Sequence, residues 1–148
     1  MPEGANAATE LHREHEEIEG LAARIAGLGP CPERAELVRR VAARFVSHTR
    51  AEERYLYPAL RSFLPDGPHD AVKQTRQDDA AERIALSIAR ADEDTVAYEA
   101  LVNQLVIDIQ RHIEEQETLL LPALIDACPR EELNHLGRQL RDGLGREG

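Results

Sequence analysis

The sequence repeats itself once, and this repeat constrains the fold more than any other feature. The segment HTRAEERYLYPAL, which begins at His48, matches HIEEQETLLLPAL, which begins at His112, so that His, Glu, Leu, Pro, Ala and Leu recur at an offset of 64 residues. The apolar residues preceding each segment align at an offset of 63, because Ile18 and Leu21 then fall on Ala81 and Ile84. Two copies of one helical hairpin explain both offsets, and two hairpins with short connections make a four-helix bundle.

Apolar residues recur at spacings of three and four along most of the chain, as they do in helices that bury one face. This pattern predicts helices over about residues 7–27, from Pro32 to Pro58, between the LPDGP turn at Leu64 and a connection at 91–94, over 95–121 and over 130–142. We expect Pro58 to kink or end the second helix. The same pattern places Val72 and Leu119 on inward faces.

The predicted fold class is therefore all-α, an up-down four-helix bundle with a short additional C-terminal helix. A chain of 148 residues suffices for one hydrophobic core and is short for two. We expect a single domain over residues 1–148, with the bundle core at about 8–126 and the helix at 130–142 covering one side of it.

The charge balance excludes several classes of partner. The chain carries 18 basic and 28 acidic residues, a net charge of −10, which repels phosphate backbones and anionic membrane surfaces. We expect no nucleic-acid and no membrane partner, and the N-terminus lacks the pattern of a signal peptide. Cys31 and Cys128 lie in connections at opposite ends of the predicted bundle, too far apart for a disulfide. A cytoplasmic location is the expectation that follows.

The chemistry is concentrated on the inward faces of the helices. His48 and Glu52 are four residues apart, so on a helix they point the same way and can share one ion. Burying a carboxylate without a partner costs several kcal/mol, so Glu52 needs a partner. A metal cation is the most economical one. His15 and His112 occupy equivalent inward positions on the first and fourth helices. Imidazoles and a carboxylate without thiolate suit non-haem iron, manganese or zinc.

These residues resemble the hemerythrin-like, or HHE cation-binding, family. The resemblance covers about residues 8–126 and rests on EHEEI at Glu14 and on the two repeated segments. It implies a carboxylate-bridged di-iron centre held by one His on the first helix, His-x-x-x-Glu on the second, one His on the third and His-x-x-x-Glu on the fourth. His15, His48, Glu52 and His112 match that pattern. Asp78 stands where the third helix should offer His, and Gln116 stands where the fourth should offer Glu.

The two departures leave three states of the site open. Asp78 can ligate or bridge metal ions, whereas Gln116 is a neutral and weaker ligand. The site could hold two ions, completed by Asp78 and by Glu115 or Glu117. It could hold one ion on His15, His48, Glu52 and His112, or it could have lost its metal.

The remaining candidates have plainer interpretations. His12, His69 and His135 are expected at the surface, and Tyr55, three residues after Glu52, is expected to pack in the core.

Three functions remain in competition. The first is a metal-binding protein, with one or two iron ions, that binds or senses a small molecule such as oxygen, peroxide or nitric oxide. The second is an oxygen-dependent non-haem iron enzyme acting on a small organic substrate, and the third is a metal-free helical module for protein interaction. Weak peroxide-decomposing or oxidase-type activity would accompany a redox-active ion. The helical surface permits a homodimer or a separate protein partner.

Overall fold

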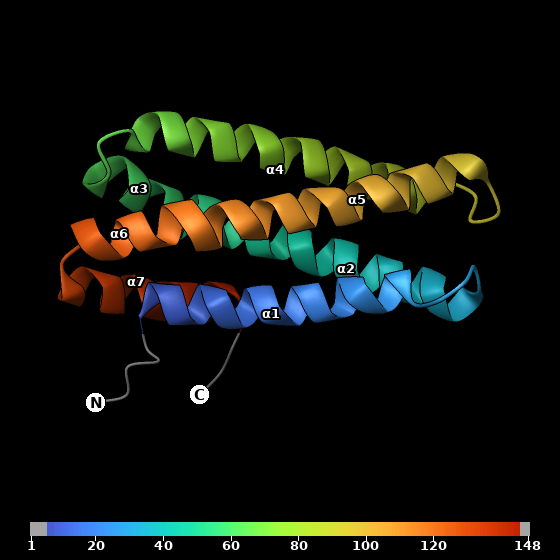
Figure 1. The fold of residues 1–148 in the computed structure, drawn as a ribbon, viewed down its shortest axis with the longest axis horizontal. Coiled ribbons are helices and arrows are strands. Elements are labelled where there is room, and N and C mark those ends of the chain that lie inside the picture. The colour runs from blue at the N-terminus through green and yellow to red at the C-terminus, as the bar shows by residue number, and fades with distance from the viewer. Residues whose placement is uncertain (1–5, 146–148) are drawn as a thin grey trace.

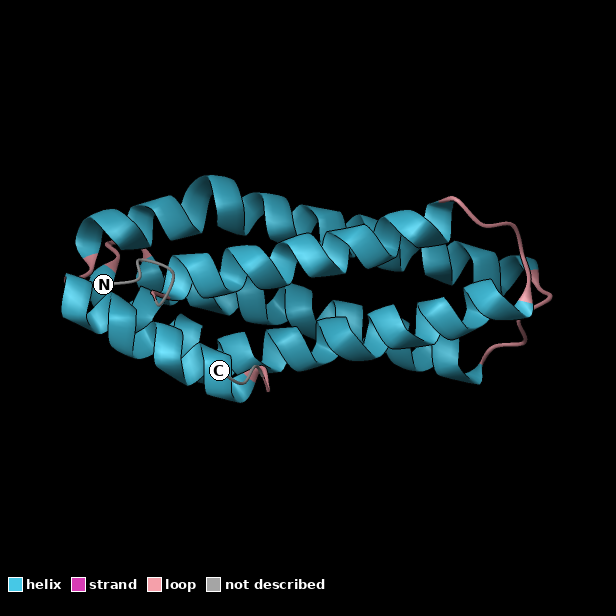
Figure 2. Ribbon diagram, turned by 90° about the horizontal axis from the view of Figure 1, so that it is seen from below, coloured by secondary structure: helices cyan, strands magenta, loops and turns pink. Residues whose placement is uncertain are grey.

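The computed structural model describes residues 6–145, and within this range every regular element is helical. The elements in chain order are α1 (Ala7–Ala26), α2 (Pro32–Ala51), the π-helical turn η2 (Glu52–Leu56), α3 (Tyr57–Phe63), α4 (Gly67–Arg90), α5 (Val96–Glu115), the π-helical turn η3 (Gln116–Leu120), α6 (Leu121–Ala127) and α7 (Arg130–Gly143). Figure 1 and Figure 2 show long antiparallel rods side by side, with α7 against the beginning of α1. The predicted four-helix bundle with an added C-terminal helix is confirmed.

Local sequence signals define where the long helices begin. The Asn6 side chain accepts a hydrogen bond from the Thr9 backbone N–H at 3.0 Å and caps α1. Thr95 caps α5 in the same way, by accepting from the Tyr98 N–H at 3.1 Å. The turn between α3 and α4 is tighter than the sequence predicts, because α4 begins within the LPDGP segment, at Gly67. A Cβ atom at Gly67 would lie 1.8 Å from the Leu60 carbonyl oxygen, so only glycine fits there.

The second and fourth rods of the bundle each contain one π-helical turn, and the two turns are related by the sequence repeat. Tyr57 donates its backbone N–H to the Glu52 carbonyl, and Leu121 donates to the Gln116 carbonyl. Each turn is followed by a proline, Pro58 or Pro122, in the first turn of the next α-helix, where its missing N–H is tolerated. The rod therefore does not end at Pro58 but continues through a changed hydrogen-bond register.

The extra residue in each π turn shifts the inward face by one position. Tyr57 is fully buried, whereas Tyr55 packs against the core and stays partly exposed. The expectation for Leu119 is wrong, since it is 64 % exposed while Leu120 and Leu121 are buried. Val72 is also exposed, because Ala71 and not Val72 is in phase with the buried face of α4. Sequence periodicity calculated for an unbroken α-helix cannot locate such a shift.

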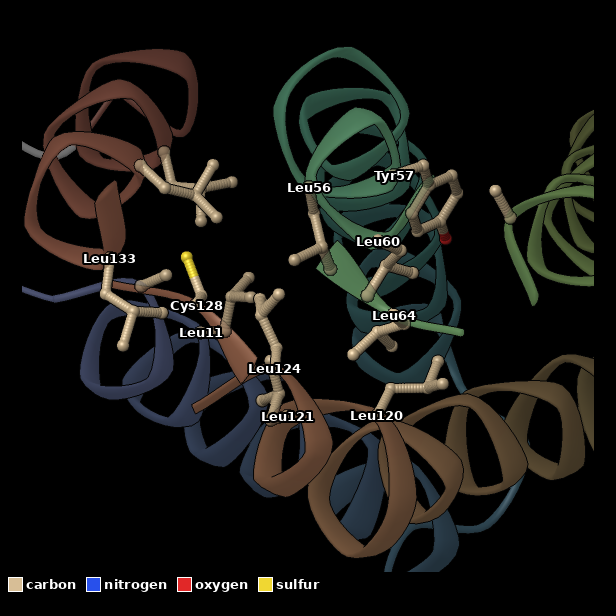
Figure 3. Packing of buried hydrophobic residues seen from close by; sticks show 14 residues of the cluster. Leu11, Leu56, Tyr57, Leu60, Leu64, Leu120, Leu121, Leu124, Cys128 and Leu133 are labelled. Atoms are coloured by element: carbon tan, nitrogen blue, oxygen red, sulfur yellow. The ribbon is translucent and has the colours of Figure 1, made fainter. Parts of the chain in front are cut away.

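The core consists of two apolar clusters at different heights of the bundle. One contains Leu11, Leu56, Leu60 and Leu124, together with leucines of α7, and Figure 3 shows these side chains gathered between the helices. The other is built around Phe45 and contains residues of α1, α2, α4 and α5. On each rod a short polar interval separates the two clusters.

Helix α7 completes the first cluster from the side. Leu133, Leu136 and Leu140 are buried against it. Arg141 donates from Nη2 to the Oε2 atom of the fully buried Glu10 at 2.8 Å, which ties α7 to α1. In the described range no helix is both long and apolar enough to cross a membrane.

Candidate metal centre

Four side chains from three rods of the bundle meet in the polar interval between the two apolar clusters. They are His15 of α1, His48 near the end of α2, Glu52 at the start of η2 and His112 of α5. Each offers a nitrogen or oxygen ligand atom, and these atoms all lie within 4.8 Å of one another. All four residues are buried, with exposed fractions of 3 % or less. The convergence that the sequence predicts is therefore present.

Glu52 lies at the centre of this group. Its Oε2 atom is 2.9 Å from Nε2 of His48 and 3.7 Å from Nε2 of His15. Its Oε1 atom is 3.0 Å from Nε2 of His112. The three imidazole rings enclose it, with centroids 5.0 to 5.9 Å apart. All three Nε2 atoms thus face one carboxylate.

The hydrogen bonding of these atoms tests whether a metal ion fits. In the part of the chain that the structure describes, the buried atoms without a hydrogen-bond partner include the Nε2 atoms of His15, His48 and His112 and the Oε2 atom of Glu52. Unpartnered polar atoms are rare in protein interiors and costly there. Donor atoms bonded to one ion at about 2.1 Å lie up to about 4.2 Å apart, so small side-chain movements bring this set onto a shared cation. The donor set fits a metal ion.

His15 is oriented by a second carboxylate outside the cluster. Its Nδ1 atom lies 2.6 Å from Oε2 of Glu117, and Oε1 of Glu117 lies 3.3 Å from the exposed His12. The hydrogen bond with His15 lowers the pKa of Glu117, so this carboxylate is ionised at pH 7 and can only accept hydrogen bonds. Nδ1 of His15 is therefore the donor. Burial lowers the pKa of His15, but the hydrogen bond with Glu117 and the nearby carboxylate of Glu52 outweigh it and raise the value to about 9.

His48 and Glu52 respond to burial in opposite ways. Burial lowers the pKa of His48, and the partial compensation from Glu52 does not restore it, so this imidazole is neutral at pH 7. For Glu52 burial acts to raise the pKa, but the nearby His48 and His112 hold it well below the usual value. A neutral imidazole and an ionised carboxylate are the forms that bind metal ions.

Asp78 is close to the centre without being one of the four converging groups. Its Oδ1 atom is 3.7 Å from Nδ1 of His112, and its Oδ2 atom accepts a 2.6 Å hydrogen bond from the Tyr57 hydroxyl. Burial, reinforced by the charge of Glu52, raises the pKa of Asp78 to about 9, although the Tyr57 hydrogen bond opposes the shift. The Tyr57 oxygen points toward α4 in Figure 3.

Gln116 is fully buried and contacts the centre through its amide. Its Nε2 donates to Oε1 of Glu52 at 3.0 Å and to Oε1 of Gln74 at 3.5 Å. Gln74 in turn donates to Glu115 at 3.1 Å. The two acidic residues considered as substitutes for a lost ligand therefore have other partners, since Glu115 bonds Gln74 and Glu117 bonds His15.

Two residues of the site, Gln74 and Tyr57, are missing from the sequence-based set of candidates. Gln74 lies four residues before Asp78 on the same helical face, a spacing that could have revealed it. Tyr57 was displaced from the expected face by the π turn. Glu117 was a candidate only as a replacement ligand, and the approach of α1 to η3 gives it a different role, as the hydrogen-bond partner of His15. His69 and His135 are exposed, as expected.

The comparison with known proteins agrees with this geometry. The family model of the hemerythrin HHE cation-binding domain matches residues 6–124, which include all four converging residues. No curated protein and no solved structure matches the chain significantly. The matched range is most of the chain and contains the whole bundle up to α6, with its buried histidines and glutamate. The chain belongs to the family of hemerythrin HHE cation-binding domains.

Proposed function

We propose that this protein is a non-haem metal-binding protein that holds one iron ion and uses it to bind or sense a small molecule such as oxygen, peroxide or nitric oxide. The observation that carries the proposal is the set of four buried, unpartnered ligand atoms on His15, His48, Glu52 and His112. Manganese and zinc suit the same ligands, and the metal analysis below distinguishes them.

The chain supplies geometry, charge and exclusion of water. Three neutral imidazoles and one carboxylate carry a total charge of −1. This charge attracts a divalent cation, and the occupied site then keeps a net charge of only +1 in the interior. The apolar clusters on either side keep water away from the polar interval. An iron ion in such a site would supply open coordination positions and exchange of one electron with a small ligand.

The groups around the remaining space can contact that ligand. The Gln116 amide and the Tyr57 hydroxyl already lie against Glu52, at 3.0 and 3.5 Å from its Oε1 atom. Each can donate a hydrogen bond to a small polar molecule beside the ion by turning away from a present acceptor, Asp78 for Tyr57 and Gln74 for Gln116. Because all four candidate ligands are buried, the site favours a diatomic molecule or peroxide over a larger organic substrate.

One ion is favoured over two by the residues where a second ion would bind. Gln116 replaces a carboxylate with a neutral amide, and its nitrogen already donates to Glu52. Asp78 accepts the Tyr57 hydrogen bond and contacts only one of the three histidines within 4.0 Å. A second cation there would lack the three imidazoles that surround the first one.

The two free cysteines support a reducing compartment, and we propose the cytoplasm. A sensing role would require a separate protein partner or a second copy of the chain to read the state of the centre.

Metal analysis of the full chain, expressed in iron-supplemented medium, tests the proposal. We expect one iron per chain, and a visible absorption spectrum that changes when the reduced protein meets oxygen or nitric oxide. His48→Ala and Glu52→Gln should each lose most of the metal, whereas His69→Ala, at an exposed position, should keep it.

Each alternative has its own outcome in the same experiment. Chains without metal after reconstitution, still helical, would support the metal-free module. Two ions per chain would contradict the single-ion site. Conversion of an organic substrate with ferrous iron and oxygen would support the enzyme.

A further inference from the structure

A groove lies on the outside of the bundle, away from the four converging residues. Its walls come from α2 and α4, and the turn η2 and Gly143 of α7 close one end. Its volume is about 610 Å³, within the range of about 300 to 1,000 Å³ that is usual for sites of single small molecules. Neither the metal centre nor the proposed function uses it.

The walls of the groove are mostly apolar and made of small side chains. Ala42, Ala43, Ala85 and Ala89 line it together with larger residues such as Leu86. Leu86 is 51 % exposed, one of the large apolar side chains that the fold leaves in contact with water. An aliphatic body placed here would remove this surface from water, which is favourable in proportion to the area buried.

Three arginines line the same groove, and their partners differ. Arg39 donates to Glu36 and Glu93, and Arg50 donates to Glu82 at 2.6 Å. Among the described residues, no carboxylate lies within 4.0 Å of Arg54 in an ion pair, and its guanidinium stacks on the Tyr55 ring, 5.2 Å from the centroid. Arg54 therefore has its hydrogen-bonding edge available while its flat face is held in place.

The position of Arg54 is informative because the chain as a whole is acidic. With a net charge of −10, most of the surface repels anions, yet the groove carries three arginines and one glutamate among its lining residues. A planar guanidinium matches a carboxylate in a bidentate hydrogen-bonded pair. The charge at this end complements an anionic head, and the rest of the groove complements an apolar chain.

We propose that this groove binds one free fatty carboxylate, with the carboxylate paired to Arg54 and the aliphatic chain lying between α2 and α4. A lipid still in a membrane is disfavoured, because the net charge of the protein repels anionic bilayers. A second protein chain is disfavoured by size. A stable protein interface buries about 800 Å² on each partner, whereas the volume of this groove is that of a site for a single small molecule.

Isothermal titration calorimetry of the full chain with dodecanoate, below its critical micelle concentration, tests the proposal. We expect one dodecanoate to bind per chain. Dodecanol, which lacks the charge, should bind at least tenfold more weakly, and propanoate, which lacks the long aliphatic chain, should not bind detectably. Arg54→Ala should weaken dodecanoate about tenfold, and Arg54→Lys should weaken it less.

Two further variants separate the groove from general effects. Arg40→Ala removes another exposed arginine, one of α2 that does not line the groove, and it should leave binding unchanged. Ala89→Trp fills the groove from an exposed position and should abolish binding while the protein stays folded and keeps its metal. Absence of dodecanoate binding, equal losses in Arg54→Ala and Arg40→Ala, or binding only to lipid vesicles would each overturn the proposal.

Discussion

The Nδ1 atom of His15 lies 2.6 Å from the Oε2 atom of Glu117, while Nε2 of the same ring faces Glu52 at 3.7 Å. When such a ring donates from Nδ1 and loses the proton on Nε2, the Nε2 lone pair can bind a cation. Carboxylates in this position orient metal-binding histidines and raise their basicity. Glu117 thus connects the half-exposed rim of the bundle to its buried centre.

The first prediction concerns this pair. Glu117→Gln should weaken iron or zinc binding by about 10- to 100-fold, because the amide holds the His15 tautomer less strictly. Titration against a competing chelator measures the affinity. Glu114→Gln, at an exposed position three residues earlier, serves as the control and should leave the affinity unchanged. Equal affinities of the wild type and Glu117→Gln would show that Glu117 does not position His15.

The second prediction is a pH dependence of the metal-free protein. The pKa of His15 is raised from 6.5 to about 9 in the folded state, so its stabilising contribution is complete below pH 6.5 and is lost as the pH rises through 9. The loss is on the order of 3 kcal/mol in the free energy of unfolding. Asp78, with its pKa raised to about 9, acts in the same direction over this window.

Urea unfolding between pH 6 and 10 measures this dependence. Glu117→Gln removes the main interaction that raises the pKa of His15, so its stability should fall less over the same range. Parallel curves for the two proteins would show that His15 is not the group responsible. Metal must be removed beforehand, since a bound cation replaces the proton.

The third prediction compares two tyrosines of the same turn. Tyr57→Phe should destabilise the protein by about 1 to 3 kcal/mol at pH 7, because it leaves the buried Asp78 without its 2.6 Å hydrogen bond. Tyr55→Phe should change the free energy of unfolding by less than about 0.5 kcal/mol, as is usual for partly exposed positions. Equal effects would place both hydroxyls in equivalent surroundings and contradict the register of the π turn.

The sequence repeat gives the fourth prediction. At the repeat offsets, Asp78 corresponds to His15 and Glu53 to Glu117, and Glu53 helps to raise the pKa of Asp78 as Glu117 helps to raise that of His15. The second half of the bundle thus keeps the outer carboxylate and lacks the imidazole. The double variant Asp78→His with Gln116→Glu restores both ligand types. We expect metal analysis to show about two ions per chain.

The corresponding single variant provides the control. Gln116→Glu alone adds a buried carboxylate without the imidazole, so it should lower the stability of the metal-free protein and bind less than two ions. A double variant that still binds one ion would show that the bundle cannot hold a second one at that height.

The family's ligand pattern and the repeat predict the helical bundle and the meeting of its four candidate ligands, because both patterns are local and periodic. His48 and Glu52 lie one helical turn apart, and helical geometry alone directs them to one side. The repeat then brings His112 to the equivalent position, and apolar spacing orients His15. These relations depend on backbone periodicity, which a single sequence records.

Tertiary packing decided the features that periodicity cannot carry. The two π turns rotate the following residues by one position, so that Tyr57 replaces Tyr55 inside the bundle and Leu119 moves to the surface. The partnership of His15 with Glu117 joins residues 102 positions apart, and the groove arises where α2 and α4 pack with small side chains. Such contacts depend on how whole helices approach each other, because a sequence pattern fixes which face of a helix is buried but not which residue of a neighbouring helix it meets.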